Sequence, residues 1–160
     1  MRLVIQRVRH ASVTVYDDGH QYEQDHISYH AGIGQGLLVL VGVEETDAHD
    51  DIEWLVGKVS RMRIFDDSAG IMNVSVQDIG GDILAISQFT LFASTKKGNR
   101  PSWLRAAKGP VSEPLYDAFC QQLSAALGHE VQRGVFGADM KVELLNDGPV
   151  TIIIDSKNRE

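Results

Sequence analysis

The 160-residue chain has little of several features that would assign it to a particular class of protein. It holds one cysteine, Cys120, so no disulfide can form within the chain. No apolar run is long enough to cross a bilayer, and Gln6-Arg7 ends the first apolar stretch before it could serve as a signal-peptide core. These absences predict a cytoplasmic protein with no membrane partner. Cys120 lies beside an apolar helical stripe, and we expect it in the core.

Positive charge is also scarce. The net charge of −7 argues against a uniformly basic surface for nucleic acid, and no DNA partner is expected. One segment, Lys96–Pro110, differs from the rest of the chain, because it gathers Trp103 and the basic residues Lys96, Lys97, Arg100, Arg105 and Lys108. A local patch of this kind can contact phosphates, although a solvated basic loop has the same composition.

Common catalytic and cofactor motifs are missing. There is no nucleophile elbow, phosphate-binding loop or zinc-protease helix. The segment Gly32–Gly36 lacks the third glycine of a dinucleotide loop and precedes a strand, so it predicts a turn, and no cofactor is expected. His20, His26 and His30 lie close together in a polar loop, but no carboxylate–histidine helix motif joins them. Solvated surface histidines are the preferred interpretation, and no metal is expected.

The hydrophobic pattern predicts one domain, residues 1–160, that mixes strands and helices. A helix capped by Thr46 or Asp47 is expected to run to about Arg63, and its acidic start and basic end suit the helix dipole. A second helix is expected from Ser112 to Gly128, with Pro114 in its first turn. Strands are expected at Leu3–Val8, Ala11–Tyr16, Leu37–Val43, Val74–Ile79, Asp82–Ser87, Val131–Gly134, Lys141–Leu145 and Thr151–Asp155.

Three of these strand predictions carry further expectations. The two glycines Gly80-Gly81 predict a hairpin between the strands that flank them. Leu37–Val43 is apolar at nearly every position, so it is expected to be buried on both faces. The polar segment Gln21–Ala31 is expected to be a loop or a hairpin excursion.

Two short stretches could carry chemistry. Asn146–Thr151 is either a turn between two strands or a stiff main-chain wedge, formed by a Gly-Pro step and placed against a ligand. Ser87–Leu91 is either a strand with alternating faces or a strand end that offers hydroxyls, an amide and main-chain N–H groups to a polar ligand. Thr90 is a possible nucleophile, but no histidine is placed by sequence to serve as its base.

Taken together, these motifs resemble the D-aminoacyl-tRNA deacylase family, also called D-tyrosyl-tRNA deacylases, over nearly the whole chain. The matching segments are Gln6–Val8, Ala11–Val15, Gly36–Val43, Met72-Asn73, Ser87–Leu91, Lys97–Ser102, Phe136–Met140 and Asn146–Thr151. The segment Asp17–Ile33 departs from the family, because it is longer and richer in histidine than expected.

The resemblance implies an α+β fold with a largely antiparallel, barrel-like sheet and two main helices. It also implies a homodimer that hydrolyses the ester between a D-amino acid and the terminal adenosine of tRNA. In that family the catalytic signature lines the pocket of one subunit, and here it corresponds to Ser87, Gln88, Phe89 and Thr90. Main-chain N–H groups near Phe89 and Thr90 would hold the oxyanion, and the 2′-hydroxyl of the substrate ribose would help to activate water.

The resemblance further implies that a cis Gly148-Pro149 step enters the pocket from the partner subunit. Arg7 would hold this step in place, while Phe136 and Met140 would lie near the pocket wall. A rigid wedge of this kind would reject an L-aminoacyl group by collision, accept a D-aminoacyl group and admit achiral glycyl-tRNA.

The resemblance makes Lys96, Lys97 and Arg100 candidate contacts to the tRNA acceptor end. Two other classes remain open, a noncatalytic nucleic-acid-binding relative of the same fold and a small-ester hydrolase that acts without RNA. The intact stretches Ser87–Leu91 and Asn146–Thr151 favour the tRNA deacylase over the binding protein. The missing catalytic triad and the basic loop disfavour the small-ester hydrolase.

Overall fold

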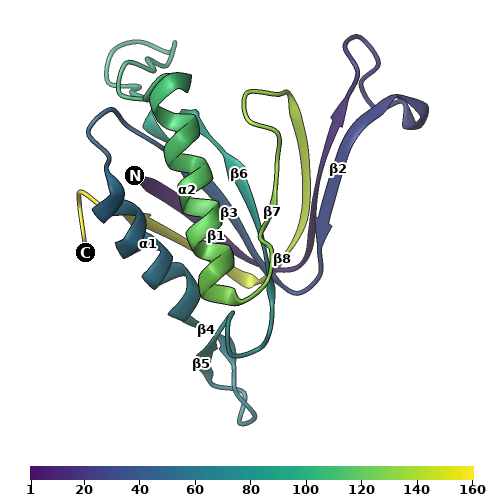
Figure 1. The fold of residues 1–160 in the computed structure, drawn as a ribbon, viewed down its shortest axis with the longest axis vertical. Helices are drawn as coiled ribbons and strands as arrows, with labels where there is room; N and C mark the ends of the chain where they lie inside the picture. The colour runs from purple at the N-terminus through teal and green to yellow at the C-terminus, as the bar shows by residue number, and fades with distance from the viewer.

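The computed structural model describes residues 1–160, in which one six-stranded sheet carries two helices side by side on one face (Figure 1). In chain order the elements are β1 Arg2–Tyr16, β2 Ile27–Ile33, β3 Gly36–Gly42, α1 His49–Arg61, β4 Arg63–Asp66, β5 Met72–Ser75, β6 Asp82–Ser87, α2 Gly109–Leu127, β7 Gln132–Arg133 and β8 Met140–Asp155. Two short 3₁₀ turns, Gln24–His26 and Phe89–Phe92, complete the fold. No helix is long and apolar enough to span a membrane.

The long strand β1 organises the sheet. Its first half pairs with β3, its second half pairs with β2, and β8 pairs with it along both halves, all antiparallel. Beyond β3 the sheet continues through β6 and β7, which are parallel to their neighbours. The predicted α+β class, with a largely antiparallel, barrel-like sheet and two main helices, is confirmed.

Two hydrophobic cores lie on opposite faces of β3 and β6. Leu37, Val39 and Val41 face the larger core, beneath the two helices. Leu38 belongs to the smaller core, which is enclosed by β1, β2 and β8. Because successive side chains of a strand point to opposite faces, β3 must be apolar throughout, and the prediction of a strand buried on both faces is confirmed. Cys120 is buried in the larger core, as expected.

Two pairs of predicted strands are each one continuous strand. Arg9-His10, which separates the first two predicted strands, lies inside β1, and Asn146–Thr151, where a turn was one of two interpretations, lies inside β8. Both predictions of separate strands are therefore wrong. The pairing register between β1 and β8 shifts on either side of Val8, so the turn-forming residues are accommodated as an irregularity in a long ladder instead of reversing the chain.

The hairpin predicted at Gly80-Gly81 is also wrong. β5 pairs with β4 to form a separate two-stranded sheet, while both edges of β6 are occupied by β3 and β7. The residues Ile83–Ile86 are buried without alternation, which is the pattern of a central strand. The segment Gln21–Ala31, in contrast, is a hairpin excursion that contributes most of β2.

Both helices begin at residues other than those predicted. α1 follows Ala48, and its Asp51 carboxylate accepts hydrogen bonds from the Ala48 N–H (2.9 Å) and the Lys157 ammonium (2.7 Å). α2 begins at Gly109, so Ser112 and Pro114 lie within the helix, and the Ser112 hydroxyl donates to the Lys108 carbonyl. The predicted C-terminal cap of α2, Gly128, is confirmed by its left-handed backbone, with φ of +80°.

Candidate active site

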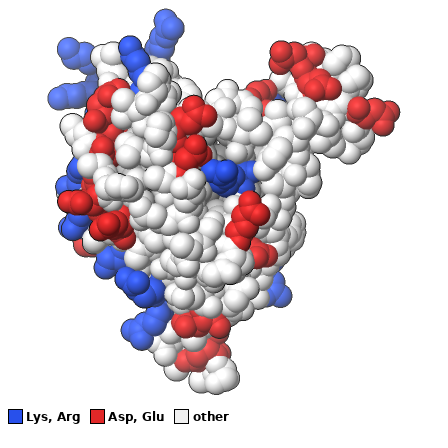
Figure 2. Space-filling view, viewed as in Figure 1, with Lys and Arg blue, Asp and Glu red and all other residues white.

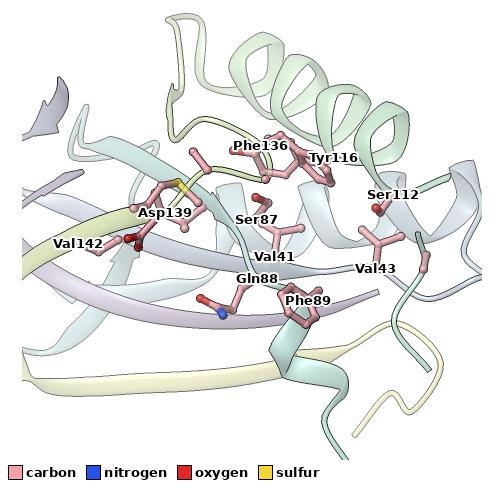
Figure 3. Close-up of a pocket in the computed structure, with 15 residues that line it drawn as sticks. Val41, Val43, Ser87, Gln88, Phe89, Ser112, Tyr116, Phe136, Asp139 and Val142 are labelled. Carbon is pink, nitrogen blue, oxygen red and sulfur yellow. The ribbon is translucent and has the colours of Figure 1, made fainter. Parts of the chain in front are cut away.

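A pocket of about 280 Å³ opens where the carboxyl end of β6 meets the N-terminal half of α2 and the loop before β8 (Figure 3). Its wall is mostly apolar, with a few polar side chains among the apolar ones, as is usual for small-molecule sites. Five residues predicted for the site line it: Ser87, Gln88, Phe89, Phe136 and Met140. Segments far apart in the chain thus meet at one cavity.

The turn Phe89–Phe92 is held close to β3 at the mouth of this pocket. The Gln88 N–H donates to the Val41 carbonyl at 2.7 Å. A Cβ atom at Gly42 would lie 3.0 Å from Leu91 Cβ, so the absence of a side chain at Gly42 permits this close approach. Phe89 and Thr90 are the first two residues of the turn, so no carbonyl within the turn accepts a hydrogen bond from their N–H groups.

Thr90 does not line the pocket in this chain. It is half-buried beside the pocket, and its hydroxyl accepts a hydrogen bond from the side-chain amide of Gln88. This contact orients the Gln88 amide. It supplies no base, because an amide N–H can only donate a hydrogen bond.

The pocket contains two titratable groups, Tyr116 and Asp139. Burial raises the pKa of Tyr116, whose hydroxyl donates to the Ala85 carbonyl at 2.9 Å. The Asp139 carboxylate is exposed at the rim, where it pairs with Lys141 at 2.7 Å and accepts a hydrogen bond from Gln21 at 2.8 Å. No histidine lines the cavity. Neither titratable group has the neighbours of an activated general base.

The Gly148-Pro149 step lies apart from the pocket. Both residues are exposed on β8, neither lines the cavity, and the peptide bond between them is cis. Arg7 is buried behind them. Its Nε donates to the Asp147 carbonyl at 3.0 Å, and its Nη1 donates to the Ile64 carbonyl at 2.7 Å. Arg7 therefore fixes the main chain that precedes the step.

Asn146 also holds this segment, and sequence reasoning assigned it no role. Its Oδ1 accepts from the Val150 N–H at 3.1 Å, and its Nδ2 donates to Gln6 Oε1 at 2.7 Å. The signal that could have found it is the ability of an asparagine side chain to bond to main chain a few residues on. Gly148 has φ of +129°, and a Cβ there would lie 3.0 Å from Arg7 Nη2, so only glycine fits.

The predicted basic residues lie on a loop above the start of α2, where blue side chains gather in Figure 2. Ser94 and Ser102 close this loop with two main-chain hydrogen bonds, which leaves Lys96, Lys97 and Arg100 exposed at its tip. Farther along the loop, Arg105 is paired with Glu44 at 3.2 Å, and Lys108 is exposed just before α2.

An aromatic contact joins this loop to the pocket. The ring of Trp103 meets the ring of Phe89 edge to face at 5.3 Å, and both rings are exposed. The basic loop is thereby tied to a residue that lines the cavity. Of the predicted groups, the structure brings the pocket residues and the basic loop close together, and it leaves Gly148-Pro149 and Arg7 outside the cavity.

Comparisons with known proteins identify the family. Residues 4–155 match the family described as D-Tyr-tRNA(Tyr) deacylase. The chain is 60% identical to the D-aminoacyl-tRNA deacylase of Bacteroides fragilis and 58% identical to that of Bacteroides thetaiotaomicron, in each case over 100% of both chains.

Two solved structures are also similar. One, called c-Myc DNA Unwinding Element Binding Protein, has a TM-score of 0.83 and 36% identity, covering 97% of this chain and 98% of that one. The other, described as a probable eukaryotic D-amino acid tRNA deacylase, shares the fold, with a TM-score of 0.77 and 18% identity over 96% and 97% of the two chains. The match to the family profile and the full-length relatives show that the chain belongs to the D-Tyr-tRNA(Tyr) deacylase family of hydrolases.

Proposed function

We propose that this deacylase removes D-amino acids and glycine from tRNA in the cytoplasm, in a site shared by two subunits, and so proofreads chirality in translation. One observation carries the proposal. Gly148-Pro149 is exposed and held by Arg7 and Asn146, yet it lies outside the pocket of its own chain. A rigid, exposed main-chain segment with no role in its own subunit is suited to enter the pocket of a second copy.

Chiral selection follows from the stiffness of this segment. In the shared site, the carbonyl oxygens of Gly148 and Pro149 would face the α-carbon of the bound amino acid. An L-side chain would point into these oxygens, and a D-side chain would point away from them. The wedge would act by collision with atoms that cannot yield. It would therefore discriminate little among D-side chains, and it would not exclude glycine.

The proposed chemistry relies on the substrate for its proton acceptor. The pocket holds no histidine, and the contacts of Tyr116 and Asp139 do not favour proton abstraction. The 2′-hydroxyl of the terminal ribose, adjacent to the ester, would help to activate water. The main-chain N–H groups of Phe89 and Thr90 would stabilise the oxyanion of the tetrahedral intermediate, and Ser87 and Gln88 would orient the ester.

The basic loop is the proposed contact to the tRNA backbone. Lys96, Lys97 and Arg100 are exposed together, and the Trp103–Phe89 contact places their loop next to the pocket mouth. Phosphates of the acceptor end could therefore bind the loop while the aminoacyl ester enters the cavity. A chain with a net charge of −7 would gain local attraction for RNA from this loop.

A nucleic-acid-binding function without catalysis is the alternative. It is favoured by the similarity to the solved structure named as a DNA unwinding element binding protein. The two functions differ in their products, because a binding protein would leave the aminoacyl ester intact. Duplex DNA should compete with the tRNA substrate only if it shares the same surface.

The test is deacylation of matched D-tyrosyl-tRNA and L-tyrosyl-tRNA by the purified protein in the presence of a chelator. Rapid loss of the D-ester alone is expected. Loss of both esters would exclude the proposed chiral wedge, whereas loss of neither by a folded protein would favour the binding function. Size-exclusion chromatography with light scattering tests the dimer, and glycyl-tRNA should be hydrolysed in the same assay.

A further inference from the structure

The hairpin between β1 and β2 carries four potential metal ligands at a regular spacing of three residues. They are Asp17, His20, Glu23 and His26. In this segment the N–H of each residue in the series bonds to the carbonyl three residues before it: His20 to Asp17 (3.1 Å), Glu23 to His20 (3.2 Å) and His26 to Glu23 (3.0 Å). The first two turns each contain a left-handed residue, Gly19 (φ +82°) or Tyr22 (φ +70°), and the third is the 3₁₀ turn Gln24–His26. Each turn brings its first and fourth residues close together. The backbone therefore brings the four side chains together.

The distances among these side chains suit a small metal ion. His20 Nδ1 lies 3.3 Å from Glu23 Oε2, and His26 Nε2 lies 3.7 Å from the same oxygen. One ligand atom from each of the three residues lies within 4.8 Å of the others. Zinc ligands sit about 2.1 Å from the metal, so neighbouring ligands of a tetrahedral site are about 3.4 Å apart. The two measured contacts bracket that separation.

Asp17 occupies the position of a supporting carboxylate. Its Oδ2 lies 3.8 Å from Nδ1 of His26, the ring nitrogen opposite the one that faces Glu23. Metal-binding histidines commonly donate their second ring N–H to a carboxylate, which fixes the ring and raises its basicity. Asp17 can make this contact after a small movement while His26 Nε2 faces the metal.

The rings of His20 and His26 are stacked, with centroids 3.8 Å apart and planes 11° apart. The lone pair of an imidazole nitrogen lies in the plane of its ring, so two parallel rings cannot both direct a nitrogen at one ion. Binding therefore requires at least one of these partly exposed rings to rotate out of the stack. His30, which the sequence placed beside them, instead bonds to Thr14 at 3.0 Å and takes no part.

We propose that His20, Glu23 and His26 bind one divalent transition-metal ion of the zinc class, with Asp17 supporting His26. Two imidazole nitrogens and a carboxylate oxygen form a ligand set suited to zinc, and three protein ligands leave the fourth position to water. The sequence favoured solvated surface histidines because it contains no carboxylate–histidine helix motif. The successive turns bring Glu23 to the two histidines without such a helix.

The proposed ion would secure the tip of the hairpin beside the pocket. Between the ligands, Gln21 donates to Asp139 at 2.8 Å, and the ring of Tyr22 lies under the Lys141 ammonium at 5.6 Å. Asp139 lines the pocket. Closing the turns around a metal would limit the movement of Gln21 and Tyr22, so the site is structural and its effect reaches the pocket rim.

The experiment uses the full-length protein after chelator treatment and dialysis. Zn²⁺ binding is measured by calorimetry, and Co²⁺ binding by its visible absorption, because tetrahedral cobalt absorbs far more strongly than the hydrated ion. The variants are His20→Ala and His26→Ala. His129→Ala is the matched control, since His129 is another partly exposed imidazole beside a carboxylate, 3.5 Å from Asp82.

One ion per chain is expected, with a tetrahedral cobalt spectrum. Each ligand variant should lose at least about tenfold in affinity, since removal even of a supporting residue costs that much, while His129→Ala should bind as the wild type does. Zn²⁺ should also slow amide hydrogen exchange in residues 17–26. Equal binding by all four proteins, no saturable binding, or no change in exchange would overturn the site. Deacylation is not a readout, so the result is independent of the proposed function.

Discussion

Removal of the Thr90 hydroxyl should leave most of the deacylation rate intact. This hydroxyl accepts a hydrogen bond from the Gln88 amide and makes no hydrogen bond to an imidazole or a carboxylate. Its loss therefore removes one neutral hydrogen bond that orients Gln88. Such a bond contributes about 0.5–1.5 kcal/mol, which corresponds to a rate reduction of about two- to tenfold.

The assay is single-turnover release of D-tyrosine from D-tyrosyl-tRNA, with enzyme in excess. Thr90→Ala and Thr90→Val are compared, because valine keeps the branched shape of threonine and removes only the hydroxyl. Thermal unfolding of each variant controls for the fold. Loss of a nucleophile or a general base costs about 10²–10⁴ in rate. A fall of more than about a hundredfold in both folded variants would refute the reasoning and give Thr90 a chemical role.

A change in the substrate tests the proposed role of the ribose 2′-hydroxyl. If the ribose 2′-hydroxyl helps to activate water, wild-type enzyme should hydrolyse D-tyrosyl-tRNA ending in 2′-deoxyadenosine at least about a hundredfold more slowly. Binding of this substrate should change little, because one hydroxyl is removed from a large interface. An unchanged deacylation rate would mean that a group of the protein, and not the 2′-hydroxyl, activates the water.

Three further predictions concern the wedge, the basic loop and the fold. Arg7→Ala removes two hydrogen bonds made by a buried guanidinium, so it should lower the free energy of unfolding by about 3 kcal/mol. It should also reduce the ratio of the D-tyrosyl-tRNA to the L-tyrosyl-tRNA deacylation rate at least tenfold. An unchanged ratio in the folded variant would contradict the wedge. Alanine at Lys97 and Arg100 together should reduce the slope of log binding constant against log salt by about 1.5, measured by filter binding, whereas Lys58→Ala on α1 should leave the slope unchanged. Burial alone would raise the pKa of Asp51, but its hydrogen bonds lower this pKa from 3.8 to about 2. The ionised carboxylate therefore stabilises the fold above about pH 4, and this contribution is lost as the pH falls towards 2. Denaturant unfolding should therefore show Asp51→Asn to be destabilised by about 2 kcal/mol at pH 6, with the difference shrinking below pH 4.

Local patterns in the sequence predicted several elements well. The apolar stripe of α1 reflects burial against one core, and the continuous apolar run of β3 reflects burial against two. Such burial can be predicted from the pattern of apolar residues. Gly128 ends α2 because a left-handed residue is needed there. Boundaries were less accurate. At the start of α1, for example, the Asp51 carboxylate also binds Lys157, and a local window does not contain a contact so distant in sequence.

Strand pairing was the part that local patterns could not predict. Gly80-Gly81 has the composition of a hairpin turn, but β6 is buried on both faces and needs two neighbours, so β3 and β7 pair with it instead. Asn146–Thr151 has the composition of a turn, but the matching irregularity in β1 lets β8 continue through it. In both cases the partner strand decided the structure, and a partner strand cannot be found in a local window.

For the candidate site, the sequence by itself determined the chemical groups that are available. It supplied the motif from Ser87 to Thr90, the Gly148-Pro149 step and the basic loop, and through them the resemblance to one family. Only the tertiary structure decided which of these groups share a cavity. It placed Phe136 and Met140 in the pocket with Gln88 and left Gly148-Pro149 outside it. The physical reason is that a local pattern reports burial and backbone preference, whereas a site depends on distances between segments that the chain brings together only when it folds.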